Sequence, residues 1–549
     1  MFFTLNEKIE NYLAILLLAL GALVLFLSSP TAGDFSWSDA PRHALNGVFV
    51  KDFIAAMPLS QPKQYAVNYY LQYPALTILF YPPLMYFIMA GFYALFGFSH
   101  TAAQASITVF YFLLGVGVYL LARRWLPLWQ AFAAAVLLMG APEIALWGRQ
   151  VMLDIPAYAW LTISALFLLR YLDNGRPAPL YLTVIFLLYA LYTKQMIIFA
   201  AAVFALAILM GRGPGVLRQW HIWSAMGLFT VCLLPLIYLT LEFGQVNLDS
   251  VAGARAEDLG RGHLGAWTYY LKQMPQQLGW ATFLLGGGFI VGMALKPTWR
   301  LPKVDTVLLL AWLVLGYFFF SAIAVREPRH DLTALLPVAL FAVLFLNRTL
   351  APLGQRYATL AALFLAVATF SYTLAFKPVP YVQGYAAAAE AVLEQAPANS
   401  TVLFSGQRDG SFIFNIRAAT SRHDISVLRA DKILLRLAIE RQRGFQDRGL
   451  TQQAIYDLLN RYGVHYVVAQ PDFWTDIPSM AALQQLLQDN SRFEPVRRIK
   501  ISANFPVLDR ELVLYRNLGP VATVPEPLTL EMVGIGRSFS GTPQAPGKP

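Results

Sequence analysis

The stretch YLAILLLALGALVLFL, residues 12–27, carries no charged side chain. Extended to residues 11–29, it is long enough to cross the ~30 Å hydrocarbon core of a bilayer as a helix. It lacks a small-residue cleavage site, which favours a retained anchor over a removable signal peptide. The whole chain of 549 residues is 57% hydrophobic and 13% charged, a composition typical of a polytopic α-helical membrane protein.

Apolar runs of similar length recur along the first 376 residues. The block at residues 179–211 is too long for one crossing and marginal for two, but the sequence YTKQ (192–195) breaks it centrally. We therefore read it as two short helices, and the sequence predicts about eleven transmembrane helices in all. The remaining runs lie near residues 11–29, 101–122, 127–145, 152–171, 222–242, 277–296, 304–324, 331–347 and 354–376.

The run FYPPLMYFIMAGFYALFG (80–97) is ambiguous, because counting it as a span reverses the orientation of everything after it. Charge asymmetry favours a segment that lies at the surface or re-enters it. With the N-terminus cytoplasmic, the inner loops then hold twelve basic and four acidic residues, as the positive-inside rule expects. The C-terminal part is placed outside, and the retained anchor fits a bacterial inner membrane.

The charged residues concentrate after the last span. Of the 72 Asp, Glu, Lys and Arg residues, 35 follow residue 376. We expect a transmembrane domain at residues 1–376, with a first outer loop and juxtamembrane helices at 30–100. Helical and strand-like patterns predict an extracytoplasmic α/β domain at 377–519. The segment 520–549 is rich in Pro, Gly and Ser, and we expect it to be disordered.

The net charge of +10 and the single cysteine exclude other classes of protein. The positive charge is spread over short loops and a mixed-charge domain, so we expect no nucleic-acid partner. Cys232 alone forms no disulfide framework and no cysteine-rich metal site. The chain lacks a Walker loop, an HExxH motif and a GxSxG motif, so nucleotide hydrolysis, zinc-protease and serine-hydrolase functions find no support.

Two outer segments each carry three ionisable residues at helical spacing. Asp39 stands before Pro41, a residue suited to a first helical turn, and Arg42 and His43 follow Asp39 at spacings of three and four. An isolated loop of this kind reads as a helix cap with a solvated face. The sequence REPRH (326–330) repeats the spacing at another outer rim, with Arg326, Arg329 and His330.

Asp154 and Lys194 interrupt apolar sequence. Asp154 lies at the start of an apolar helix, where a deeply placed charge costs about 2.5 kcal/mol or more. A salt bridge with Arg149 would be a structural explanation, but a spacing of five residues suits a helix poorly. Lys194 breaks the block at 179–211, where function and a side chain that snorkels to the interface are equally good readings.

Acids and cations at one outer rim suit a reaction in which an acid deprotonates a hydroxyl and cations stabilise a departing phosphate. The same residues could couple protons to transport in a transporter or lipid flippase. A third reading, a membrane-anchored binding protein whose C-terminal domain does the work, leaves Asp154 and Lys194 unexplained. These alternatives stay open on the residues alone.

The order of five features resembles a known family. After the acid-bearing first loop come YPPL (81–84), MLDIPA (152–157), YTK (192–194) and PRHDLTALLP (328–337). This order resembles that of the GT-C glycosyltransferases of the protein O-mannosyltransferase type, glycosyltransferase family 39, a group that includes lipid A aminoarabinose transferases. The resemblance covers about residues 1–376. It implies an enzyme that moves a sugar from a polyprenyl-phosphate donor to an acceptor, with inversion, at the extracytoplasmic face.

The resemblance also implies roles for individual residues. Asp39 corresponds to the family's first-loop acid and Asp154 to its second acid. Lys194 resembles the lysine near the donor phosphate, and Arg329 with His330 resembles a late Arg-Tyr pair in which His replaces Tyr. We expect Arg42 and Arg326 to assist at the donor phosphate, and Asp34 and His43 to support the site.

One departure concerns metal binding. The family's first loop often carries an adjacent Asp-Glu pair, whereas Ala40 follows Asp39 here. A second carboxylate, from Asp34 or Asp154, could take its place, so a divalent metal ion is open and no other cofactor is expected. The acceptor, whether protein, lipid or glycan, is not specified by the sequence. Membrane lipids are the expected surroundings.

Overall fold

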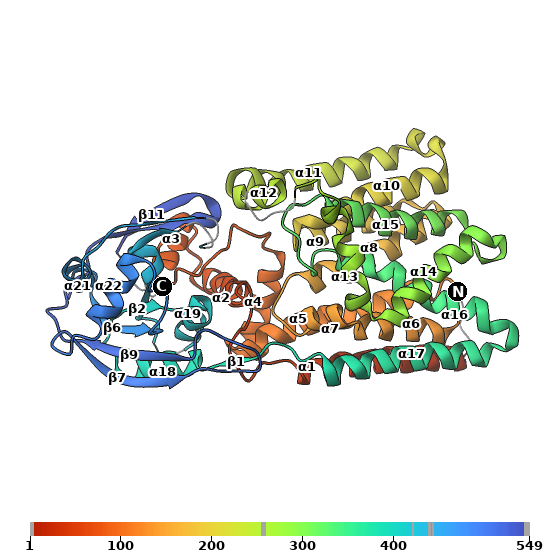
Figure 1. Ribbon diagram of the computed structural model, residues 1–549. Helices are drawn as coiled ribbons and strands as arrows, with labels where there is room; N and C mark the ends of the chain where they lie inside the picture. Colours follow the sequence, from red (N-terminus) through yellow and green to blue (C-terminus); the bar gives the residue numbers. More distant parts are fainter. Residues whose placement is uncertain (1–4, 254–259, 420–421, 438–440, 442–443, 543–549) are drawn as a thin grey trace.

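The computed structural model describes residues 5–253, 260–419, 422–437, 441 and 444–542. The chain forms a long helical body with an α/β domain at one end (Figure 1). Juxtamembrane helices from the first loop, α2 (Ala40–Ala56) and α3 (Pro62–Gln72), lie between the two parts. The expected order of a membrane body followed by an α/β domain is confirmed.

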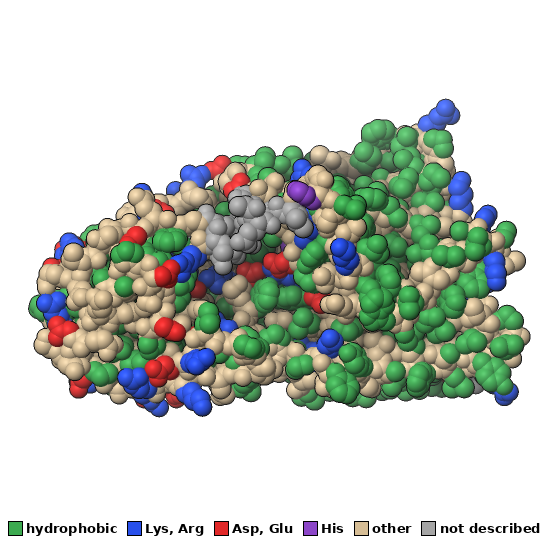
Figure 2. Space-filling model, viewed as in Figure 1, with side chains coloured by type: hydrophobic (Ala, Val, Ile, Leu, Met, Phe, Trp, Pro, Cys, Tyr) green, Lys and Arg blue, Asp and Glu red, His purple; other side chains and the backbone are tan. Residues whose placement is uncertain are grey.

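Eight helices in the described part of the chain are long and apolar enough to cross a membrane. They contain few charged side chains and cover the body with hydrophobic surface, which Figure 2 shows as a green face beside the more polar α/β domain. These spans are α1 (Leu5–Leu27), α5 (His100–Ala122), α8 (Asp154–Asn174), α10 (Phe199–Arg212) with the preceding turn η1 (Gln195–Ile198), α11 (Trp220–Phe243), α15 (Lys303–Ser321), α16 (Leu335–Leu350) and α17 (Gln355–Phe376).

The remaining expected crossings are broken or short helices. The run at 127–145 is split into α6 (Leu128–Gly140) and α7 (Pro142–Gly148), which meet at an angle of 68°. Pro142 explains the break, because a proline cannot continue the hydrogen-bond ladder of the preceding helix. Two shorter apolar helices, α9 (Pro177–Leu191) and α14 (Trp280–Leu295), lie where two further crossings were expected.

The ambiguous run at 80–97 forms the short helix α4 (Leu84–Phe96). Its 13 residues span about 20 Å at 1.5 Å per residue, less than the ~30 Å of a bilayer core. It packs against α2 at Gly47, where an added Cβ would lie 2.8 Å from Met89. This close packing joins α4 to the juxtamembrane helices of the first loop.

The α/β domain is built on a five-stranded sheet of order β3-β2-β6-β9-β7. Strand β2 pairs in parallel with β3 and β6, and β9 pairs antiparallel with β6 and β7. Strands β2, β3, β6 and β9 coincide with the strand-like patterns TVLFSG (401–406), DISVLR (424–429), VHYVVAQ (464–470) and ELVLYRN (511–517), and β7 was not foreseen. The elements are α18 (Tyr385–Gln395), β2 (Thr401–Ser405), α19 (Asp409–Ala418), β3 (Ser426–Arg429), α20 (Ala430–Ile433), α21 (Gln452–Arg461), β6 (Val464–Ala469), α22 (Pro478–Leu486), β7 (Phe493–Lys500) and β9 (Glu511–Asn517).

Smaller elements complete the chain. Helix α12 (Gln245–Ala252) follows α11, and α13 (Leu264–Leu278) precedes α14. The expected span at 277–296 begins instead at Trp280, because Gly279, with φ of 85°, separates α13 from α14. Two-stranded pairs are formed by β1 (Val382–Gln383) with β8 (Ser502–Ala503) and by β4 (Leu435–Leu437) with β5 (Phe445–Asp447).

The expectation of a disordered segment from Pro520 is wrong for the residues that the structure describes there. Strands β10 (Leu528–Met532) and β11 (Arg537–Gly541) form an antiparallel hairpin around the turn η7 (Val533–Ile535). Leu528, Leu530 and Met532 alternate with polar residues and are buried. This period-two pattern inside a Pro- and Gly-rich segment drives the strand to form against the domain. Residues 543–549 lie outside the described part.

Candidate active site

A cavity of about 400 Å³ lies where the helical body meets the first-loop helices. Its walls come from the loop after α1, the starts of α2 and α8, the break between α9 and η1, helix α12 and the loop before α16. Six of the residues expected to form a site line it: Asp39, His43, Asp154, Lys194, Arg329 and His330. Segments that are far apart in the sequence therefore meet here.

Asp39 immediately precedes α2 and makes no capping bond with its side chain. Its carboxylate instead accepts a hydrogen bond of 3.2 Å from Nη2 of Arg329. Burial acts to raise the pKa of Asp39, but the positive charge of Arg329, with further contributions from His43 and Arg42, outweighs it and holds the pKa below its usual value. Asp39 is therefore a carboxylate at neutral pH.

Arg329 is fixed from several sides. Its Nε donates to Oε2 of Glu327 at 2.6 Å. Its guanidinium lies 5.5 Å from the ring centre of Trp37 and 5.4 Å from that of Trp147, within range of cation–π attraction. With only 10% of its side chain exposed, Arg329 presents a positioned charge to the cavity.

Asp154 and Lys194 form an ion pair in the lining of the same cavity. Asp154 is the first residue of α8, and Lys194 lies in the break that ends α9. The pair is largely buried, with 5% and 12% of the two side chains exposed. The alternative pairing of Asp154 with Arg149 is not formed, because Arg149 donates to the carbonyls of Ala145 and Lys377 instead.

The two histidines of the cavity are buried and uncharged at neutral pH. Burial lowers the pKa of His43 to about 4 and that of His330 to about 3. His43 Nδ1 lies 3.0 Å from the hydroxyl of Tyr86. Nδ1 of His330 is buried and has no hydrogen-bond partner among the described residues.

Of the expected site residues, Asp34 and Arg326 lie away from both cavities. Asp34 binds the α/β domain, accepting hydrogen bonds from the backbone of Gly384 and Tyr385 and from Asn415. Arg326 donates to the carbonyls of Ser321 and Ala324 at the end of α15. Neither residue lines the cavity. The side chain of Asp34 contacts the α/β domain, and that of Arg326 contacts nearby backbone carbonyls.

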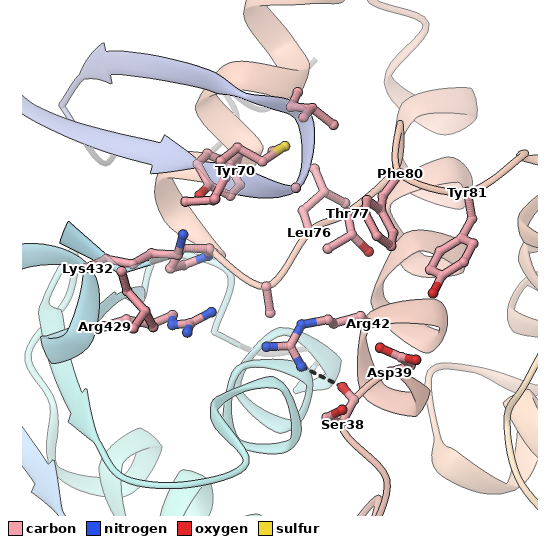
Figure 3. A pocket seen from close by; sticks show the side chains of 17 residues that line it. Ser38, Asp39, Arg42, Tyr70, Leu76, Thr77, Phe80, Tyr81, Arg429 and Lys432 are labelled. Atoms are coloured by element: carbon pink, nitrogen blue, oxygen red, sulfur yellow. Dashed lines mark hydrogen bonds between the residues drawn. The ribbon is translucent and has the colours of Figure 1, made fainter. Parts of the chain in front are cut away.

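Arg42 lines a second, smaller cavity of about 200 Å³ on the α/β-domain side of Asp39 (Figure 3). Asp39, Phe80 and Tyr81 line both cavities, so the two adjoin at these residues. Arg42 donates to the Ser38 carbonyl at 2.5 Å and to Asp409 at 3.1 Å. The spacing of Arg42 relative to Asp39 correctly suggested a shared face, but Arg42 points toward the domain.

Some lining residues were missed by sequence reasoning. Tyr81 and Glu327 stand inside the quoted YPPL and REPRH motifs, so their positions were available although their participation was not recognised. Arg429 and Lys432 line the smaller cavity and come from the α/β domain. No signal in the sequence links them to the first loop, because only the docking of the domain brings them there.

The donor set does not favour a metal ion. Among residues 5–253, 260–419, 422–437, 441 and 444–542, no group of three or more His, Cys, Asp and Glu side chains could hold one. The three carboxylates that line the larger cavity, Asp39, Asp154 and Glu327, each already pair with Arg329 or Lys194. The arrangement instead supplies carboxylates beside fixed positive charges and apolar walls, which suit removal of a proton beside a departing anion.

Comparison with known proteins was made for sequence and for structure. Residues 81–239 match the model of the dolichyl-phosphate-mannose-protein mannosyltransferase family. No curated protein matches the sequence. Among solved structures, ArnT from Cupriavidus metallidurans bound to undecaprenyl phosphate is similar with a TM-score of 0.62 and 15% identity, over 92% of this chain and 99% of that one.

Two further structures share the fold. The Archaeoglobus fulgidus oligosaccharyltransferase in its apo form matches with a TM-score of 0.53 and 13% identity, over 93% of this chain and 76% of that one. The mycobacterial arabinofuranosyltransferase AftD matches with a TM-score of 0.51 and 14% identity, over 91% of this chain and 41% of that one. All three comparisons include both the helical body and most of the α/β domain.

Proposed function

Because this chain has the fold of the GT-C membrane glycosyltransferases, we propose that it transfers a sugar from a polyprenyl-phosphate donor to an acceptor hydroxyl, with inversion at the anomeric carbon. The observation that carries the proposal is the meeting of Asp39 with Lys194 and Arg329 around one cavity of about 400 Å³. A similar fold has been solved with undecaprenyl phosphate bound, which supports a donor of this class.

Asp39 acts as the base in this mechanism. Its carboxylate accepts the proton of the acceptor hydroxyl as the hydroxyl oxygen attacks the anomeric carbon. The bond from that carbon to the phosphate oxygen breaks on the opposite side, and polyprenyl phosphate leaves with the bonding electrons. The low pKa of Asp39 keeps the carboxylate deprotonated and ready for this step.

Lys194 and Arg329 stabilise the charge that develops on the phosphate. Both are held in place by carboxylates, Lys194 by Asp154 and Arg329 by Asp39 and Glu327, so they need little reorganisation when the donor binds. Asp154 is in this account a positioning residue. His330, neutral at physiological pH, offers the phosphate a hydrogen bond rather than a charge.

The apolar part of the cavity suits the isoprenoid chain of the donor. Val246, Leu248 and Val251 from α12 face Phe319 and Ile323 at the end of α15 across the cavity. The lipid tail of the donor would pack against these apolar side chains.

A divalent metal ion fits this site poorly. Carboxylate oxygens are suitable ligands for such an ion, but one oxygen of Asp39 already accepts a hydrogen bond from Arg329 and one oxygen of Asp154 accepts one from Lys194. Ala40 follows Asp39 and supplies no second carboxylate. The mechanism therefore routes no step through a metal.

We also propose the orientation in which the N-terminus is cytoplasmic and the α/β domain is extracytoplasmic, in a bacterial inner membrane. Figure 2 shows Lys and Arg side chains along the end of the helical body that faces away from the α/β domain. Basic loops favour the cytoplasmic side. Both cavities then open on the extracytoplasmic face, with the acceptor a protein, lipid or glycan there.

The purified chain in liposomes, supplied with radiolabelled polyprenyl-phosphate sugars and an extract of extracytoplasmic acceptors, tests this function. We expect label to pass from the lipid fraction to the acceptor fraction. In a transporter or flippase, label would stay on the lipid and change leaflet, and that result would replace the proposal. Lys194→Gln should slow the transfer, whereas Lys500→Gln, an exposed lysine of β7, serves as the matched control.

A further inference from the structure

The smaller cavity is surrounded by three cations from three different elements. Arg42 lies in α2, Arg429 ends β3, and Lys432 belongs to α20. Asp39 is the one acidic residue among those that line this cavity. Figure 3 shows Arg42 between Asp39 on one side and Arg429 with Lys432 on the other. The far end of the cavity from Asp39 is therefore positively charged.

Acids behind the lining hold these cations in position. Asp409 forms salt bridges of 3.1 Å with Arg42 and 2.8 Å with Arg429. Asp431 forms a salt bridge of 2.5 Å with Nη2 of Arg429. Neither acid lines the cavity. Arg42 and Arg429 thus share two acids, and Lys432 is a third basic group in the same lining.

In the part of the chain that the structure describes, Lys432 forms no salt bridge with a carboxylate. Its Nζ donates to the backbone carbonyl of Glu531 at 2.6 Å and lies 5.7 Å from the ring centre of Tyr70. Burial, followed by the repulsion of Arg429, lowers the pKa of Lys432 to about 7. An anion beside this amine would relieve both effects and favour its protonated form.

The C-terminal hairpin closes the cavity with apolar surface. Met532, Val533, Gly534 and Ile535 line it, and an added Cβ on Gly534 would lie 3.3 Å from Phe80. The cavity therefore combines a cationic end, an apolar wall and an opening toward Asp39.

We propose that this cavity is the acceptor subsite, and that it takes an acceptor whose reacting hydroxyl is carried on a molecule with an anionic group, a phosphate or a carboxylate. Arg42, Arg429 and Lys432 bind the anion, and the hydroxyl reaches Asp39 at the border with the larger cavity. The acceptor role rests on the proposed glycosyl transfer, whereas the anion-binding site rests on the charges alone.

Binding of small probes to the full chain in detergent tests this inference, with the larger cavity first saturated with undecaprenyl phosphate. The probes are glycerol 1-phosphate, glucuronate, inorganic phosphate and, as a neutral control, glucose. We expect at least one anion and not glucose to bind. Lys432→Gln and Arg429→Gln should weaken this binding about ten-fold or more, and Lys500→Gln should not. Comparison of glycerol 1-phosphate with glucuronate separates a phosphate from a carboxylate acceptor.

The pH dependence gives a second readout. The charged and titratable groups around Lys432 are Arg42 from α2, Tyr70 from α3, Asp409 from α19, Glu531 from β10, and Arg429 and Asp431 beside it. Because the amine must be protonated to bind an anion, binding should weaken as pH rises above about 7 in the wild type. In Lys432→Gln this dependence should disappear for glucuronate, whose carboxylate stays ionised throughout this pH range.

The outcomes separate the two proposals. If undecaprenyl phosphate binds and no anion does, the acceptor inference is wrong and the donor proposal stands. If an anion binds but undecaprenyl phosphate does not, the donor proposal fails and the anion site stands. If Lys194→Gln abolishes anion binding while Lys432→Gln leaves it intact, the anion lies in the larger cavity and the inference is overturned. Thermal stability of each variant without probe shows whether the fold survives the substitution.

Discussion

Asp39 and Asp34 stand five residues apart in the same loop and have different tasks. Asp39 faces a cavity and one guanidinium, so its oxygens stay available to a ligand. Asp34 is buried at the domain interface and accepts three hydrogen bonds. The sequence identified both as candidates. The number of hydrogen-bond donors around each carboxylate distinguishes them: Asp39, with few donors, can act as a base, and Asp34, with three, has a structural role.

The histidines give a prediction about pH. His43 and His330 have pKa values lowered to about 4 and about 3, so both stay neutral as pH rises from 5 to 8, and Asp39 stays ionised over the same range. Hydrolysis of the donor without acceptor, which does not involve Lys432, should be flat between about pH 5 and 8. A rise or fall centred near 6.5, the usual histidine value, would show that one histidine titrates during catalysis.

Asp34→Asn should destabilise the protein without changing the reacting groups. The new amide would place N–H donors against the N–H groups of Gly384, Tyr385 or Asn415, which costs about 1–3 kcal/mol for a buried group left unsatisfied. We expect a lower Tm and a donor affinity close to that of the wild type. Asp457→Asn, at an exposed position of α21, is the matched control. An unchanged Tm would contradict the docking role of Asp34.

At the scale of elements, breaks in helices create the site. Lys194 lies where α9 ends, and Arg329 with His330 lies in the loop that separates α15 from α16. The polar YTKQ sequence in an apolar block predicted the first of these breaks. Proximity of the segments could not be predicted, because contacts between helices depend on packing that periodicity does not record.

The C-terminal hairpin was missed because its Pro- and Gly-rich flanks outweighed a short alternating pattern. A chain that ends after Glu526 should lose Met532 and Ile535 from the wall of the smaller cavity. It should also lose the Glu531 carbonyl, which accepts a hydrogen bond from Lys432. We expect weaker binding of anionic probes and a lower Tm. A chain that ends after Thr542 keeps the hairpin and should behave as the wild type. Equal anion binding by both truncated chains would rule out a role for the hairpin at this cavity.

At the scale of the whole molecule, hydrophobic length and charge asymmetry predicted the membrane body, its approximate span number and an α/β domain after residue 376. Helix α7 and the bend at Pro142 were not foreseen, since one apolar run covered both helices. The surface on which the α/β domain docks could not be predicted from the sequence either, because it joins residues such as Asp52 and Arg417, which are more than 300 positions apart.

The orientation can be tested with engineered cysteines. Cys232 is the one natural cysteine, so Cys232→Ser leaves a chain without thiols. Into this chain we would place Lys500→Cys in the α/β domain or Arg218→Cys at the opposite end of the body. In spheroplasts, a membrane-impermeant maleimide should label the first variant directly and the second only after lysis. The reverse pattern would invert the proposed topology.

The measurement that tests the central claim most directly is the rate of sugar transfer from a radiolabelled polyprenyl-phosphate donor by Asp39→Asn, compared with wild type and the Asp457→Asn control. Undecaprenyl phosphate affinity is measured in parallel to confirm that the cavity is intact. Loss of a positioned base should slow transfer by about 10²–10⁴-fold while the lipid still binds. Transfer by Asp39→Asn at the wild-type rate would contradict the account, because the group that removes the acceptor proton would then have to be another residue.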